Sequence, residues 1–175
     1  RGYFSWSFFD VYFHPLGNLM KKNIYKKVYK TLKSLFKSNP PLSFQAKMSL
    51  SASVLACQFD NWIFCGFYVS CNKSDLEIGP YQGRILPCTN IKYGAGVCGT
   101  SALKKQTIIV NNVLECENYI SCDSNTKSEI VVPIFNKKKL IAVLDIDSNK
   151  RNDFDKIDKE NLEKISTLFF EQNQK

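Results

Sequence analysis

Residues 128–147 read SEIVVPIFNKKKLIAVLDID and contain two strong strand patterns. Both ends of this stretch, Ser128–Phe135 and Leu140–Asp147, are rich in β-branched and apolar residues, which is typical of strands. The four polar residues between them, 136–139, form a turn of hairpin length. We therefore expect two strands that pair with each other in an antiparallel sheet, with side chains that alternate between its faces.

Further strands and helices are expected outside this hairpin. The other expected strands are Trp62–Ser70, Leu76–Gly79 and Thr107–Val110. The expected helices are residues 23–37, a segment to about residue 58 with Ser43 as its N-cap, residues 101–106 and residues 159–172. The segments 79–99 and 111–127 are expected to be irregular loops. Hairpins with terminal helices predict an α+β fold, an antiparallel sheet with the N- and C-terminal helices packed on one face.

Length and composition favour a single globular domain. The chain has 175 residues, of which 44% are apolar and 23% charged, and this excludes a disordered tail, a collagen-like fibre and a small disulfide knot. Apolar runs stay well below the roughly 18 residues of a membrane-spanning helix, so no transmembrane segment is expected. We assign residues 20–175 to the domain and residues 1–19 to an N-terminal extension.

Seven of the 19 extension residues are aromatic, and the first methionine of the chain is Met20. The extension lacks the leading basic cluster of a signal peptide. An arm that packs on the domain, a processed targeting remnant and an upstream sequence remain alternatives.

The net charge of +8 is concentrated near the N-terminus. Residues 20–38 hold seven lysines and no acid, whereas residues 39–175 hold 16 basic and 15 acidic residues. A field over the whole protein that would attract nucleic acid is therefore not expected. The basic helix, residues 21–37, could lie on an anionic membrane or on RNA, although a solvated lysine face is the more common meaning of such a pattern.

Seven cysteines and one histidine, His14, limit the chemistry. One histidine makes a Cys/His zinc site or a Ser–His or Cys–His triad improbable. Without a secretory signal a reducing, cytoplasmic compartment is expected, where cysteines are more often buried or redox-active than bridging. We take Cys57, Cys65, Cys71 and Cys116 as buried or incidental, and Cys88, Cys98 and Cys122 as candidate reactive thiols in polar loops.

Three acidic residues, Glu129, Asp145 and Asp147, fall at one end of the hairpin, because the start of one antiparallel strand lies beside the end of its partner. If these carboxyl groups are packed together, at least one pKa should rise and give an acid that donates a proton near neutral pH; a solvated sheet edge is the alternative. Thiols beside an acid suit reduction of a sulfoxide or peroxide, with a second thiol resolving the product as a disulfide. The cysteine spacing contains no C-x-x-C, so no metal is expected.

Five motifs in order resemble the free methionine-(R)-sulfoxide reductases, a family of stand-alone GAF-domain enzymes. They are Gly66-Phe67-Tyr68, Gly79-Pro80-Tyr81-Gln82-Gly83, Gly94-Ala95-Gly96-Val97-Cys98-Gly99, Cys122-Asp123-Ser124 with Ser128-Glu129-Ile130-Val131-Val132-Pro133, and Val143-Leu144-Asp145-Ile146-Asp147-Ser148. The resemblance covers about residues 23–172.

The resemblance implies a GAF domain that reduces free methionine-(R)-sulfoxide through a cysteine sulfenic acid and an intramolecular disulfide. It implies Cys122 as nucleophile, Cys88 as resolving cysteine and Cys98 as a third cysteine that can pair with either. It also implies that Glu129, Asp145 and Asp147 hold the substrate and supply a proton. Thioredoxin is the implied reductant, a homodimer the implied assembly, and no metal or organic cofactor is needed.

The chain departs from the family pattern at positions near the implied pocket. The family has a tryptophan two residues before Gly-Phe-Tyr, where this chain has Phe64 and, two residues earlier, Trp62. Trp62 and Phe64 should share one face of a strand, so we expect both, with Tyr68, to bind substrate. Where the family often has Phe-Pro-Gly-His, this chain has residues 116–119, Cys-Glu-Asn-Tyr.

A second function class is a non-catalytic GAF-type sensor that binds a small molecule, because fold alone does not fix function. Three cysteines around an acidic pocket argue against it, since a sensor has no need of them.

Overall fold

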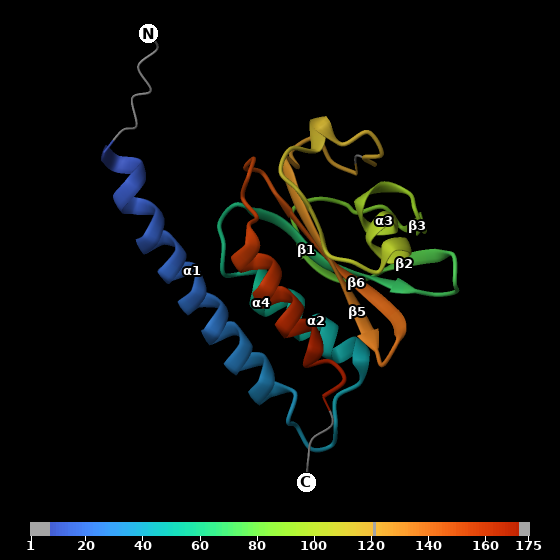
Figure 1. Cartoon of the computed structure of the whole chain (residues 1–175). Helices are drawn as coiled ribbons and strands as arrows, with labels where there is room; N and C mark the ends of the chain where they lie inside the picture. Colours follow the sequence, from blue (N-terminus) through green and yellow to red (C-terminus); the bar gives the residue numbers. More distant parts are fainter. Residues whose placement is uncertain (1–7, 121, 172–175) are drawn as a thin grey trace.

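A six-stranded antiparallel sheet forms the centre of the computed structural model, which describes residues 8–120 and 122–171 (Figure 1). Its strands lie in the order β3-β2-β1-β6-β5-β4. They are β1 (Trp62–Ser70), β2 (Asp75–Gly83), β3 (Asn90–Lys92), β4 (Ile108–Val110), β5 (Ser128–Asn136) and β6 (Lys139–Ser148). The α+β prediction and the central hairpin are confirmed, and β1 has the expected bounds.

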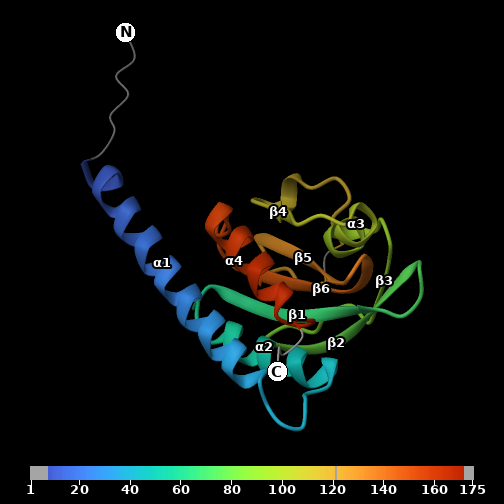
Figure 2. The same ribbon diagram turned by 60° about the horizontal axis from the view of Figure 1, so that its bottom comes forward.

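Helices α2 (Phe44–Ala56) and α4 (Lys156–Thr167) cover one face of the sheet, and α1 (Phe8–Leu35) packs against these two helices (Figure 2). The apolar side chains of these helices form the larger core together with β1, β5 and β6. Fully buried members of this core include Leu32, Leu55, Leu144 and Leu162. As predicted, Ser43 caps α2, and its hydroxyl accepts a hydrogen bond from the Ala46 amide at 3.2 Å. On the opposite face, α3 (Gly96–Lys104) and the loops enclose a second, smaller core.

Two helices differ from the sequence expectation. Helix α1 begins at Phe8 rather than near residue 23, and it crosses the boundary proposed at residue 20. Pro15 and Gly17 lie inside it, and both residue types normally disfavour a helix interior, which is why periodicity placed the start later. Helix α3 begins at Gly96, inside the segment 79–99 that was expected to be a loop. Strand β2 also extends into this segment, as far as Gly83.

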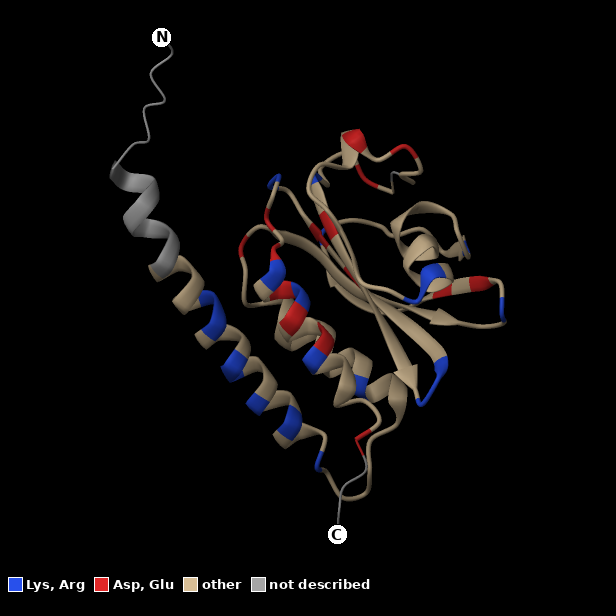
Figure 3. Cartoon of the chain, in the orientation of Figure 1, with Lys and Arg blue, Asp and Glu red and all other residues tan. Residues whose placement is uncertain are grey.

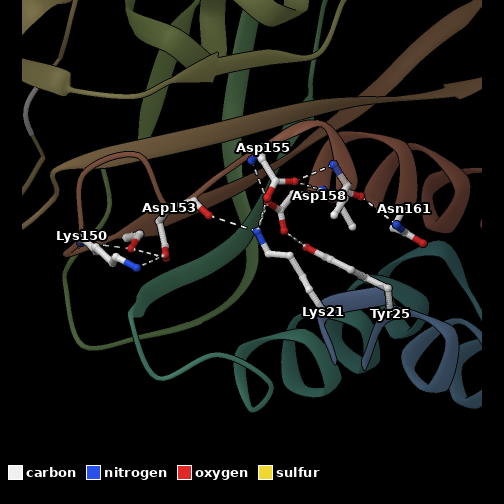
Figure 4. A network of polar contacts seen from close by, with 9 residues as sticks. Lys21, Tyr25, Lys150, Asp153, Asp155, Asp158 and Asn161 are labelled. Carbon is white, nitrogen blue, oxygen red and sulfur yellow. Dashed lines mark hydrogen bonds and ion pairs between the residues drawn. The ribbon is translucent and has the colours of Figure 1, made fainter. Parts of the chain in front are cut away.

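A buried polar network fastens α1 to the start of α4 (Figure 4). The Lys21 ammonium pairs with Asp158 and, at 3.1 Å, with Asp155, and the Tyr25 hydroxyl donates to Asp158 at 2.7 Å. Asp155 is the N-cap of α4, and it forms a capping box with Asp158. Because Asp158 and Tyr25 are both fully buried, each polar group depends on its partner there.

Replacing Asp158 with alanine should therefore lower the free energy of unfolding by about 3 kcal/mol, since the change leaves a buried hydroxyl and an ammonium group without their partner. Urea unfolding monitored by circular dichroism measures this loss. The matched control is Glu160→Ala, which removes an exposed ion pair to Lys156 in the same helix and should change stability little. Equal losses in the two variants would contradict a stabilising role for the network.

The lysines of α1 follow one another along the helix from residue 21 onward (Figure 3). Lys33 pairs with Glu171 at 3.4 Å, whereas Lys22, Lys26, Lys27 and Lys30 are exposed and form no ion pair within the described part of the chain. None of the described helices combines the length and apolarity needed to cross a bilayer.

Candidate active site

The sheet register brings the three hairpin carboxylates together. Glu129 on β5 lies directly opposite Asp147 on β6, and Asp145 lies two residues before Asp147 on the same face. The three residues are only 5%, 6% and 8% exposed, for Glu129, Asp145 and Asp147 respectively. The alternative of a solvated sheet edge is therefore wrong, because all three side chains are buried and line one pocket beneath α3 and the loops.

Burial raises the pKa of every member of this cluster, and the charges of neighbouring carboxylates add to the rise for Glu129 and Asp147. The pKa of Glu129 lies well above its usual range because of burial and the charges of Asp145 and Asp147. Burial, with smaller contributions from Asp145 and Asp123, raises the pKa of Asp147 in the same way. Burial raises the pKa of Asp145 to about 6, while hydrogen bonds from Cys98 and Glu129 limit the rise. The raised pKa values of Glu129 and Asp147 favour their protonated forms, which can donate a proton.

Two of the three candidate cysteines are bonded to each other beside this pocket. Cys88, between β2 and β3, and Cys122, between β4 and β5, form a disulfide with a Cα–Cα distance of 5.7 Å. Both are partly exposed. Cys122 lines the pocket together with the carboxylates, whereas Cys88 does not line it. A thiol at position 122 would thus face a molecule held against Glu129, Asp145 and Asp147.

The third candidate, Cys98, does not lie in a loop as expected. It sits on α3, is 3% exposed, and its sulfur lies within 4.8 Å of carboxylate oxygens of Glu129 and Asp145. Burial and these neighbouring carboxylates raise the pKa of the Cys98 thiol well above its usual range, so it stays protonated and is a poor nucleophile. Metal binding by these three residues would have to displace the protons of Cys98 and Glu129.

The glycines of residues 94–99 allow the chain to turn into α3 and allow this helix to pack closely against the strand before it. Gly94 and Gly96 have positive φ angles of 88° and 59°, which turn the chain into α3. Gly99, inside the helix, touches the preceding strand so closely that a Cβ atom on it would lie 2.1 Å from the Lys92 carbonyl oxygen. The glycines that suggested a loop are thus the residues that bring Cys98 against the sheet.

We expect Gly99→Ala to destabilise the domain by at least about 2 kcal/mol, because backbone and not a flexible side chain stands in the way. Thermal unfolding followed by circular dichroism tests this. Gly17→Ala in α1 is the matched control: a Cβ there meets nothing within 4 Å, so helix propensity should raise stability slightly. A Gly99→Ala protein as stable as the unaltered chain would show that α3 can shift without cost.

The aromatic residues of β1 divide between the two faces of the sheet. Phe64 and Tyr68 line the pocket, and Tyr81 stacks on Phe64 with ring centroids 5.5 Å apart. Trp62 packs in the helix-side core against Phe59. The expectation that Trp62 shares a face with Phe64 and binds substrate is wrong, because a β-bulge between them shifts the register by one residue and reverses the face.

Sequence reasoning missed several pocket residues. Tyr119 lines the pocket from the loop before Cys122, and Thr126 lies buried nearby. Burial, followed by the charge of Asp147, raises the pKa of the Tyr119 hydroxyl. Tyr119 stands at the position where the free methionine-(R)-sulfoxide reductases often have the histidine of Phe-Pro-Gly-His. This correspondence was the signal in the sequence that could have pointed to Tyr119 as a pocket residue.

Comparisons with known proteins agree with this geometry. A family model described as "GAF domain" matches residues 52–169. The chain is 47% identical to a free methionine-R-sulfoxide reductase of Saccharomyces cerevisiae over 62% of this chain and 60% of that protein. It is 34% identical to the enzyme of the same name from Escherichia coli over 70% of this chain and 73% of that protein.

A solved structure extends the likeness to three dimensions. The free methionine-R-sulfoxide reductase from Neisseria meningitidis in complex with its substrate superposes with a TM-score of 0.79 and 34% sequence identity, over 86% of this chain and 88% of that one. The chain therefore belongs to the GAF-domain family, and within it is a homologue of the free methionine-R-sulfoxide reductases.

Proposed function

We propose that the protein reduces free L-methionine-(R)-sulfoxide to methionine at the pocket formed by Cys122, Glu129, Asp145 and Asp147. The observation that carries the proposal is that Cys122 lines the same pocket as three buried carboxyl groups. The relatives named as free methionine-R-sulfoxide reductases support the same reaction.

The carboxylate cluster suits a free amino acid as substrate. The ammonium group of free methionine sulfoxide would be attracted by the cluster, and its arrival would favour ionisation of the nearest carboxyl group. The buried Oδ1 atom of Asp145 has no hydrogen-bond partner among the described residues, so an ammonium group would satisfy it. A methionine sulfoxide residue within a protein has no such charge and carries chain on both sides, which gives discrimination.

Reduction of the sulfoxide proceeds in two steps. The Cys122 thiolate attacks the sulfoxide sulfur, a carboxyl group of the cluster protonates the oxygen, and the products are methionine and a Cys122 sulfenic acid. The Cys88 thiol then attacks the Cys122 sulfur, which forms the disulfide and releases water. Glu129 is the first candidate for the proton donor, since its pKa lies well above the usual range.

Cys98 has a different part in this proposal. Its buried, protonated thiol forms a hydrogen bond with Asp145 and so affects the protonation of the carboxylates. Cys98 takes no part in the thiol–disulfide chemistry. The site residues are therefore Cys122 as nucleophile, Cys88 as resolving thiol, and Glu129, Asp145, Asp147, Phe64 and Tyr68 around the substrate.

The disulfide has to be reduced after each turnover, and a thioredoxin is the proposed reductant. A reducing compartment such as the cytoplasm supplies it. A homodimer, implied by the sequence resemblance, is the proposed assembly, which sedimentation equilibrium would test. No cofactor is required by the two steps.

The decisive experiment couples NADPH oxidation to thioredoxin reductase, thioredoxin and this protein. Free methionine-(R)-sulfoxide, the (S) epimer and an N-acetylated sulfoxide are supplied in parallel. Turnover with the free (R) form alone is expected. Ligand binding without consumption of reductant, from folded and fully reduced protein, would favour the sensor instead.

A further inference from the structure

Exposed leucine and isoleucine side chains flank both halves of the disulfide. Leu86 is 83% exposed and precedes Cys88 by two residues. Ile120 is 39% exposed, precedes Cys122 by two residues and also borders the pocket. Since the two cysteines are bonded to each other, these apolar side chains belong to neighbouring loop segments. The two side chains form an apolar rim beside the partly exposed disulfide, and a partner protein that reaches the sulfurs would contact them.

We propose that Leu86 and Ile120 form the docking surface for the protein dithiol, of the thioredoxin class, that reduces the Cys88–Cys122 disulfide. This inference rests on the proposed function, which generates the disulfide in every cycle. The occupant follows from the chemistry at the centre of the rim: a reductant has to bring a thiolate into line with the S–S bond. A nucleic acid or a membrane has no reaction to perform there.

The two sulfurs are not equivalent for this attack. Cys122 faces the pocket with Glu129 and Asp145, whereas Cys88 does not line the pocket and follows directly on the segment that bears Leu86. The incoming thiolate attacks the Cys88 sulfur, a mixed disulfide forms, and the S–S bond breaks to release Cys122 as the leaving thiolate. The second thiol of the partner then attacks its own sulfur, so Cys88 leaves as a thiol and the partner becomes a disulfide. Two electrons pass from the partner, and Cys122 is returned as the nucleophile.

The test compares two reductants on the same protein. Leu86→Ser should lower kcat/KM for thioredoxin about tenfold, the effect expected when one leucine no longer becomes buried on binding. Turnover of methionine-(R)-sulfoxide driven by dithiothreitol should stay within about twofold, because Leu86 does not line the pocket and a small dithiol needs no docking surface. The matched control is Leu114→Ser, since Leu114 is 78% exposed but lies on the 3-10 helix η1 (Val113–Glu115) and is not one of the two rim residues; both rates should be unchanged.

A trapping experiment tests the attacked sulfur. A thioredoxin whose second active-site cysteine is serine stops at the mixed disulfide, and peptide mass spectrometry should find it bonded to Cys88. Attachment to Cys122 would overturn the assignment.

The outcomes separate this inference from the proposed function. Normal dithiothreitol turnover with an unchanged thioredoxin kcat/KM in Leu86→Ser would overturn the docking surface and leave the reductase intact. Dithiothreitol turnover with no response to any thioredoxin-class protein would overturn the partner. Absence of turnover from the unaltered protein with dithiothreitol would instead reject the proposed function itself.

Discussion

Replacing Cys122 with serine should abolish reduction of free methionine-(R)-sulfoxide, with a loss in kcat of more than about 10³-fold, as expected when a covalent nucleophile is removed. A serine hydroxyl is not ionised near neutral pH, so it cannot replace the Cys122 thiolate as the nucleophile. The coupled NADPH assay gives the multiple-turnover rate. Stopped-flow mixing of the reduced protein with excess sulfoxide gives the first turnover.

The resolving cysteine should behave differently. Cys88→Ser protein should release one equivalent of methionine per chain and then stop, with a sulfenic acid left on Cys122 that dimedone can trap. The matched control is Cys71→Ser, because Cys71 is an exposed free cysteine at the far end of β1 and its loss should leave both phases unchanged. Full activity in Cys122→Ser, or continued cycling in Cys88→Ser with thioredoxin, would contradict the assigned roles.

The part of the site that could be predicted from the sequence is the part built on regular alternation. Glu129, Asp145 and Asp147 occupy consecutive same-face positions of a hairpin, and the two-residue period of a strand fixes their proximity. The same period failed at Trp62, because a bulge inserts one residue before Phe64. A bulge reverses every face assignment beyond it and leaves no mark in composition.

The position of Cys98 could not be predicted for a different reason. Glycine-rich sequence normally indicates a loop, but here Gly99 is needed for close contact between a helix and the Lys92 carbonyl. Whether a glycine serves a turn or a contact depends on what lies opposite, which is long-range information. The position of Tyr119 in the pocket wall could not be predicted for a similar reason. Tyr119 lies in an irregular loop, whose course does not follow from a periodic pattern of apolar residues.

Replacing Glu129 with glutamine should lower kcat/KM about 10²- to 10⁴-fold, the range typical of a lost general acid. The amide keeps the shape of the side chain but cannot give a proton to the sulfoxide oxygen. In the unaltered protein, kcat/KM should fall as pH rises through the elevated pKa of Glu129, because the proton to be donated is then lost. The variant should lack this limb of the pH profile, and Glu117→Gln, an exposed carboxylate in the loop before Cys122, should retain it.

The same substitution should make the folded protein more stable at alkaline pH, and this separates a proton donor from a structural residue. The native pKa of Glu129 lies well above the unfolded value of 4.5, so the native state binds the proton more tightly. Stability from this group is complete below pH 4.5 and is lost as pH rises through the native pKa. Glutamine is neutral at every pH, so Glu129→Gln should have the higher Tm at pH 8 and nearly the same Tm at pH 4. A variant that lost activity and also stability at pH 8 would mean that ionised Glu129 holds the site together, and the proton donor would then have to be sought in Asp147, whose pKa burial also raises.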